Sequence, residues 1–146
     1  MSVLEIEGID SKDHWSTHLG LEMLEVTPER VLARIVIEAR HHQPYGIAHG
    51  GVYASIVEGV ASYGAGLNVL SRGLKGVVGV SNTTDFLRSH SHGELRCEGR
   101  PVHSGRRQQL WQVEITRSSD GKLVARGQVR FQTLDETPAE RRARVA

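Results

Sequence analysis

The segment from Gly50 to Ser71 most constrains the fold, because it is long, patterned for a helix and almost free of charge. Apolar residues recur along it at helical spacing, at Val52, Ile56, Val60, Tyr63 and Leu67. Its glycines are poor helix formers, each costing roughly 1 kcal/mol relative to alanine. A helix that tolerates them is held by tertiary packing, and its small residues indicate close burial against a sheet.

Segments with strand character flank this helix. Leu21–Val26 and Arg30–Ala39 precede it and are separated by a turn around Pro28, which presets φ and cannot donate to a ladder. Four more strands are expected after the helix, over residues 77–87, 94–103, 108–117 and 122–133, with turn residues at 91–93 and 119–121. Two strands, one long helix and four strands predict an α+β fold with a mostly antiparallel sheet and the helix packed on it. Residues 11–19 suit a short helix or turn.

The length of 146 residues fits one domain. We expect residues 1–134 to form that domain and the highly charged residues 135–146 to form a loose tail. The formal net charge of +1 argues against a general role on nucleic acid or at a membrane surface. No apolar run is suited to span a bilayer, and the N-terminus lacks a signal-peptide pattern. One cysteine excludes an intramolecular disulfide and fits a reducing compartment, so we expect a cytoplasmic protein.

Glu58 is the only charged residue between Gly50 and Ser71, and it lies in the middle of the predicted helix. Burying a carboxylate without a neutralising partner is costly, and such groups are over-represented in active sites. The alternative is a solvent-facing stripe, although such a stripe normally carries more than one charge. Residues four apart share a helix face, so the Ser62 hydroxyl can either orient a water near Glu58 or bond its own backbone.

The start of this helix, at His49, Gly50 and Gly51, offers backbone N–H groups at the positive end of the helix dipole. Such donors stabilise an oxyanion that develops during a reaction. Glycines also open helices for steric reasons alone. The helix thus carries a candidate catalytic carboxylate and a candidate oxyanion donor.

The stretch QPYGIAHGGVYAS from Gln43 to Ser55, with Glu58 seven residues after Gly51, resembles the hotdog-fold thioesterases. The similarity is to the group that includes phenylacetyl-CoA-pathway thioesterases, the glutamate-using 4-hydroxybenzoyl-CoA thioesterases and the proofreading thioesterase of enterobactin synthesis. It continues in residues 77–80 (VVGV) and 101–111 (PVHSGRRQQLW), so that it extends over nearly the whole predicted domain.

The resemblance implies a hotdog fold, in which an antiparallel sheet wraps around one long central helix. It implies that Glu58 acts as nucleophile or general base and that the Gly50 N–H polarises the thioester carbonyl. It also implies that Gln43 and His49 position the thioester or the attacking water, and that Ser62 holds that water.

Helix geometry predicts that the active site is shared between two subunits. Gly50 and Glu58 are eight residues apart, which is roughly 12 Å of axial rise. A reacting carbonyl must lie within a few ångströms of both its attacking group and its oxyanion donor. The Gly50 N–H is therefore expected from the partner subunit of a two-fold homodimer with facing helices. The family resemblance implies such dimers, commonly paired into a homotetramer.

Coenzyme A, as part of the substrate, brings a pyrophosphate and a ribose 3′-phosphate, which a near-neutral protein must meet with placed cations. The candidates for CoA binding are Arg88, His103, Ser104, Gly105, Arg106 and Arg107. Arg106 and Arg107 follow a strand end where backbone N–H groups can join them, and the corresponding loop of the family lies near the CoA nucleotide. The alternative for each arginine is a solvated charged turn.

We expect no metal and no cofactor besides the CoA of the substrate. The chain has eight histidines, with His41 and His42 adjacent and His90 and His92 near a turn. It has no HExxH motif and no cysteine-containing zinc pattern.

The sequence therefore predicts a thioesterase that hydrolyses an aryl or medium-chain acyl-CoA to the free acid and CoA. Glu58 either attacks the carbonyl carbon or deprotonates water, and the sequence does not separate these two roles. One alternative is a non-catalytic acyl-CoA-binding or sensing domain. Another is an enoyl-CoA hydratase, but hotdog hydratases pair an acid with a histidine shortly after it, and no histidine follows Glu58 until His90.

Overall fold

A computed structural model describes residues 13–146. The predictions for the N-terminus and for the first residues of the expected 11–19 helix lie outside these residues. The elements, in chain order, are α1 (His14–Leu19), β1 (Glu22–Thr27), β2 (Arg30–Ile37), the 3-10 helix η2 (Ala39–His41), α2 (Gly50–Ser71), β3 (Gly76–Phe86), β4 (Gly93–Ser104), β5 (Gln108–Arg117), β6 (Leu123–Leu134) and α3 (Pro138–Val145).

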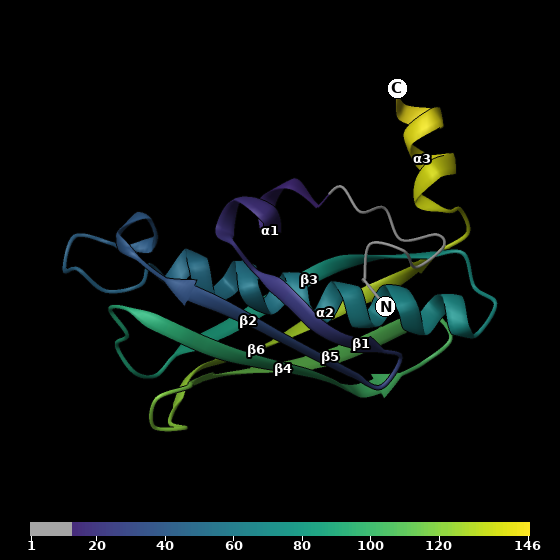
Figure 1. Ribbon diagram of the computed structural model, residues 1–146. Coiled ribbons are helices and arrows are strands. Elements are labelled where there is room, and N and C mark those ends of the chain that lie inside the picture. Colours follow the sequence, from purple (N-terminus) through teal and green to yellow (C-terminus); the bar gives the residue numbers. More distant parts are fainter. Residues whose placement is uncertain (1–12) are drawn as a thin grey trace.

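The six strands form one antiparallel sheet in the order β1-β2-β4-β5-β6-β3. Figure 1 shows β1 and β2 in front of α2, β4 and β5 below it and β3 behind it, so that the sheet wraps around the helix. The predicted α+β hotdog fold and its element order are confirmed, and the predicted helix matches α2 from Gly50 to Ser71. No helix among residues 13–146 has the length and hydropathy to cross a membrane.

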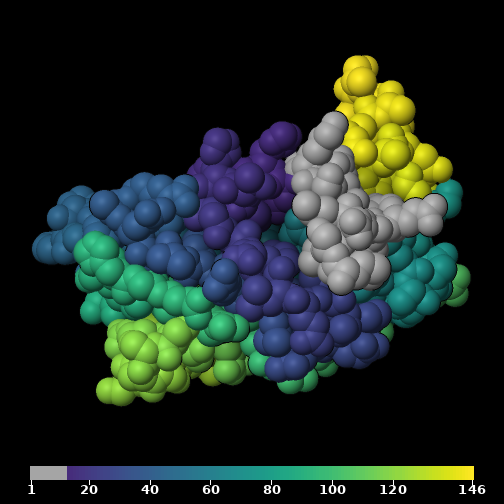
Figure 2. Space-filling view, viewed as in Figure 1, coloured from purple at the N-terminus to yellow at the C-terminus, as the bar shows by residue number. Residues whose placement is uncertain are grey.

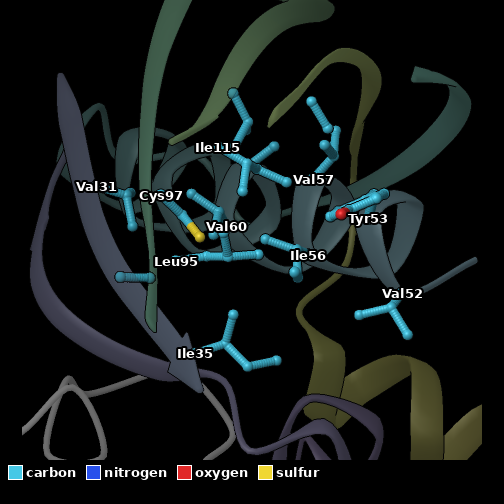
Figure 3. Close-up of a cluster of buried hydrophobic side chains, with 14 of the residues drawn as sticks. Val31, Ile35, Val52, Tyr53, Ile56, Val57, Val60, Leu95, Cys97 and Ile115 are labelled. Carbon is cyan, nitrogen blue, oxygen red and sulfur yellow. The ribbon is translucent and has the colours of Figure 1, made fainter. Parts of the chain in front are cut away.

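The core lies between α2 and the sheet. Ile56, Val57 and Val60 of α2 are fully buried and face Leu95 of β4 and Ile115 of β5 (Figure 3). Each such side chain contributes about 1.5–3 kcal/mol through its burial. The helix is therefore stabilised by packing rather than by its glycine-rich sequence.

Gly64 lets α2 approach the sheet closely. A Cβ atom at this position would overlap the ring of Trp111 on β5. Trp111 is fully buried, as expected for a core residue, and its indole N–H donates to Gln109 Oε1 at 2.7 Å. The Gln109 amide in turn donates to the Ala65 carbonyl of α2 at 3.3 Å. The helix and β5 are thus joined by a close apolar contact and by a buried polar chain.

The C-terminal prediction needs correction, because Pro138–Val145 form helix α3 rather than a loose tail. Thr137 and Glu140 make a reciprocal capping box with proline in the first turn, which is a strong helix start. Glu136 accepts hydrogen bonds from Arg141 and Arg144. No residue of α3 is buried, and Figure 2 shows α3 as a lobe that stands out from the rest of the surface.

The Trp111 contact predicts opposite effects of alanine at two glycines of α2. Gly64→Ala should lower the free energy of unfolding, because overpacking costs about 1–3 kcal/mol and outweighs the roughly 1 kcal/mol gain in helix propensity. Gly66→Ala is the matched control, since no described residue lies within 4 Å of its Cβ position, and it should stabilise by about 1 kcal/mol. Urea unfolding of both variants measures the difference, and equal gains would contradict the packing role of Gly64.

Candidate active site

Glu58 lies on the side of α2 that the sheet leaves uncovered, beside β3. Its side chain is exposed within one chain, and a Cβ atom at Gly79 of β3 would lie 3.5 Å from Glu58 Oε1. Glu58 forms no ion pair with any residue of the described part of the chain. The expected apolar surroundings are therefore not supplied by its own subunit, because this side of α2 faces away from the core.

β3 is irregular next to Glu58 and is tied to the same helix. Its pairing with β6 shifts register between Gly79 and Ser81, which marks a β-bulge beside the carboxylate. Bulges are over-represented next to active sites, where they redirect the strand. The Asn82 amide donates to the Ala54 carbonyl at 2.9 Å, one turn before Glu58. Sequence reasoning did not single out Asn82, since a lone strand asparagine carries no distinctive signal.

The start of α2 presents backbone donors, as predicted. His49 is the N-cap, and its Nδ1 accepts from the Gly51 N–H at 2.8 Å, so a neutral His49 carries its proton on Nε2. Among residues 13–146 the Gly50 N–H has no hydrogen-bond acceptor. A Cβ atom at Gly50 would overlap the Phe86 ring, so glycine at this position lets the end of β3 lie against the helix start.

A hollow of about 240 Å³ opens at this helix start, lined by Gln43, Gly50, Tyr53, Phe86 and Arg88 among others. Gln43 Oε1 accepts from the Tyr45 N–H, which leaves the side-chain NH₂ group as a donor. Burial raises the pKa of Tyr53, so its phenol stays protonated at neutral pH. The structure thus brings together Gln43, Gly50 and Arg88. Sequence reasoning missed Tyr53 of α2 and Phe86 of β3, and the position of Phe86 in the hollow depends on the pairing of β3 with β6.

Ser62 lies one turn after Glu58 on the same helix. Its side chain is partly exposed, and its hydroxyl forms no hydrogen bond with any residue from 13 to 146. Ser55 behaves differently, because its hydroxyl donates to the Gly51 carbonyl at 2.8 Å. The alternative for Ser62 was a hydrogen bond from its hydroxyl to the backbone of its own helix. Ser55 makes a bond of this kind, and Ser62 makes none with a described residue.

The predicted CoA-binding loop lies at the other end of the helix. Arg72, just after α2, donates to the Gly105 carbonyl at 3.1 Å. Fourteen residues separate Arg72 from Glu58, about 21 Å of axial rise. Neither Arg106 nor Arg107, both exposed, forms an ion pair with a described residue. The loop of residues 103–107 therefore lies near the C-terminal end of α2. Arg88 lies in the hollow at the N-terminal end of the same helix.

The buried histidines have structural partners. His41 accepts from the Glu38 N–H and donates to the Leu19 carbonyl. His90 accepts from Arg117 and donates to the Gly93 carbonyl at 3.0 Å, so its ring is occupied away from Glu58. Residues 13–146 contain no group of three side chains able to hold a metal ion.

A sheet wrapped around one long helix, with a carboxylate and the helix start on the uncovered side, defines a hotdog-fold protein of the thioesterase type. Residues 45–124 match the family model described as Thioesterase superfamily, and the chain belongs to this family.

Three relatives illustrate the family. Rv1847 of Mycobacterium tuberculosis, named as a candidate esterase, is 44% identical over 125 residues, which are 85% of this chain and 89% of that protein. Its solved structure superposes with a TM-score of 0.81, covering 86% of this chain and 99% of that one. The proofreading thioesterase EntH of Cronobacter turicensis is 33% identical over 67% of this chain and 70% of its own. The 1,4-dihydroxy-2-naphthoyl-CoA hydrolase of Escherichia coli is also 33% identical, over 67% and 65%.

The burial of the single cysteine predicts that it is unreactive in the folded protein. Cys97 of β4 is buried, and desolvation raises the pKa of its thiol to about 12, so the nucleophilic thiolate is essentially absent at pH 8. An aromatic disulfide reagent should release no chromophore from the native protein at pH 8 and one equivalent after denaturation. Rapid labelling of the native protein would contradict this, and Cys97→Ala supplies the blank for both measurements.

Proposed function

We propose that the protein hydrolyses an acyl-CoA thioester to a carboxylic acid and CoA. The observation that carries this proposal is Glu58, the sole charge on α2, which lies on the uncovered face without an ion pair to any described residue. The membership of the thioesterase superfamily supports a hydrolase, and the E. coli relative is named for a CoA thioester.

In the proposed reaction the Gly50 N–H polarises the thioester carbonyl, assisted by the positive end of the helix dipole. Glu58 either attacks the carbonyl carbon or removes a proton from the attacking water. If Glu58 attacks, the C–S bond breaks to leave a mixed anhydride on Glu58, the thiolate takes a proton from solvent, and water then cleaves the anhydride to release the acid and restore the carboxylate. If Glu58 activates water, the hydroxyl adds to the carbonyl carbon, the C–S bond breaks, and the proton held by Glu58 passes to the departing sulfur. The Gln43 NH₂ group and His49 orient the thioester or the water, and the free Ser62 hydroxyl holds that water near Glu58.

The proposed site needs two copies of the chain. Gly50 and Glu58 lie roughly 12 Å apart along one helix, too far to act on the same carbonyl. A two-fold dimer with antiparallel facing helices brings the Gly50 of one subunit to the Glu58 of the other and creates two equivalent sites. By family resemblance, two such dimers form a tetramer.

The exposed edge strand supports this assembly. β3 is an edge of the sheet, and its apolar side chains are open to solvent in one chain: Val78 is 44% exposed, Val80 55% and Phe86 58%. A long, apolar, unpaired edge strand invites pairing with another chain. A second copy that covers β3 would also cover the neighbouring face of α2 and remove Glu58 from bulk water.

For the substrate's CoA, we propose that Arg106 and Arg107 bind phosphate groups together with Arg88, the neighbouring backbone, His103 and Ser104. Both loop arginines lack an ion-pair partner among the described residues, which leaves them available for phosphate. In an antiparallel dimer the loop of one subunit and Arg88 of the other lie at the same end of the site. No further cofactor is invoked, and the single buried cysteine supports a reducing cytoplasmic setting.

The proposed catalytic role of Glu58 predicts that removing its carboxylate abolishes most turnover. Glu58→Ala should lower kcat for the preferred acyl-CoA at least about 100-fold, because the group that attacks or activates water is lost. Circular dichroism should be unchanged and the melting temperature should not fall, since the side chain makes no ion pair with a described residue and its removal from a covered dimer face relieves a desolvation cost. Retention of most of kcat would contradict the catalytic role and favour a binding domain, and Glu114→Ala, at an exposed glutamate of β5, is the control.

Complementation between two inactive variants tests the shared site. Glu58→Ala removes the carboxylate, and Gln43→Ala should disable the helix-start side, because Gln43 lines the hollow with Gly50. In a mixed dimer one site carries both lesions and the other is intact. Equal mixing with random exchange should restore about a quarter of wild-type activity, since half the dimers are mixed and half their sites work. With exchange verified and both parents inactive, no recovery would mean that one chain supplies both groups.

A further inference from the structure

A second hollow, of about 240 Å³, lies beyond Ser62 on the same side of α2, between the helix, the start of β3 and the base of α3. Its lining includes Ser62, Tyr63, Gly66, Leu70 and Val77. Aliphatic and glycine residues make up much of the lining. An apolar cavity of about 150 Å³ is known to hold benzene, so this hollow has room for a ring-sized group.

The hollow lies along the same face of α2 as Glu58 and Ser62, which act in the proposed reaction. Residues four apart share a helix face, so Glu58, Ser62, Gly66 and Leu70 follow one another along α2. Ser62 is about 6 Å of axial rise from Glu58, and Gly66 is about 12 Å away. An acyl group attacked at Glu58 enters this hollow at the Ser62 side when it extends along this row of residues. A benzoyl ring is shorter than the separation between Glu58 and Gly66, whereas an extended octanoyl chain spans most of it.

Gly66 is the unusual member of this row. Gly64, two residues earlier, faces the Trp111 ring and has no room for a side chain, whereas the Cβ position of Gly66 meets no atom of residues 13–146 within 4 Å. Close packing therefore does not require glycine at Gly66, and its φ is not in the left-handed region. Glycine is among the least favourable residues inside a helix. What it provides here is empty space at the wall of the hollow.

We propose that Gly66 is a specificity-determining residue, whose missing side chain sets the depth of a pocket for an uncharged acyl chain of medium length. This inference rests on the proposed acyl-CoA hydrolysis. The apolar lining fits an aryl group or a medium-length alkyl chain. The charged groups of the lining have other partners, since the Asp13 carboxylate accepts from the Ser16 N–H and Lys75 lies 3.9 Å from Glu140.

The experiment compares Gly66→Ala and Gly66→Leu with wild type on acetyl-CoA, octanoyl-CoA and benzoyl-CoA. Gly66→Leu should lower kcat/KM for octanoyl-CoA about 10- to 100-fold, the factor associated with burying one apolar side chain. Benzoyl-CoA, whose ring ends short of Gly66, should lose less than octanoyl-CoA. Acetyl-CoA, which does not reach the hollow, should change less than about 3-fold. Gly66→Ala should show a smaller effect of the same kind and a higher melting temperature. Ser71→Ala, in the same helix outside the hollow, should leave the ratio of the substrates unchanged.

A uniform loss on all three thioesters would overturn the proposal, because it would place the pantetheine arm rather than the acyl group in the hollow. An unchanged ratio in a folded Gly66→Leu protein would overturn it as well. Calorimetric binding of octanoyl-CoA and free CoA to the Glu58→Ala variant, with and without Gly66→Leu, gives the same comparison without turnover. Selective weakening of octanoyl-CoA there supports the pocket even if wild type hydrolyses nothing, an outcome that would count against the proposed hydrolysis instead.

Discussion

The close approach of α2 to β5 is the contact on which the rest of the structure depends. Gly64 meets the Trp111 ring, and the Trp111–Gln109–Ala65 chain of hydrogen bonds satisfies the buried polar groups at the same point. This contact holds one side of a 22-residue helix against the sheet, where a charged group would be costly. The one charged residue of α2 is therefore confined to the opposite side, where β3 and the helix start lie nearby.

In the proposed reaction, one chain does not supply both the carboxylate and the oxyanion donor to the same carbonyl. A single straight helix carries both the N-terminal donor and the carboxylate, and a helix cannot fold back to bring two of its own turns together. Helix geometry thus separates the two groups by a fixed axial distance, and only a second helix, lying antiparallel, removes that separation. The apolar, solvent-exposed edge of β3 beside Glu58 is consistent with such a neighbour.

Sequence analysis predicts best where the signal is local. The bounds of α2 follow from periodicity and glycines, and most strand bounds lie within one or two residues of the structure. α3 was missed because its charge suggests disorder, although Thr137, Pro138 and Glu140 form a legible capping motif. Glu58 was expected to be buried, and it is exposed, because it lies on the side of α2 that the sheet does not cover. The separation of Arg88 from Arg106 depends on non-local strand pairing, which sequence spacing does not reveal.

Gly64 and Gly66 are both glycines of α2, but the absence of a side chain has a different consequence at each position. At Gly64 the absent side chain lets the helix and the sheet touch, and at Gly66 it leaves a space that no described residue fills. Replacing the first disturbs the contact on which the fold depends, whereas replacing the second affects only the wall of a hollow. A helix that is stabilised by burial of its sheet-facing side can tolerate changes on the other side at small cost in stability. The fold thereby leaves the residues that would recognise the acyl group free to vary while the carboxylate and the helix start stay in place.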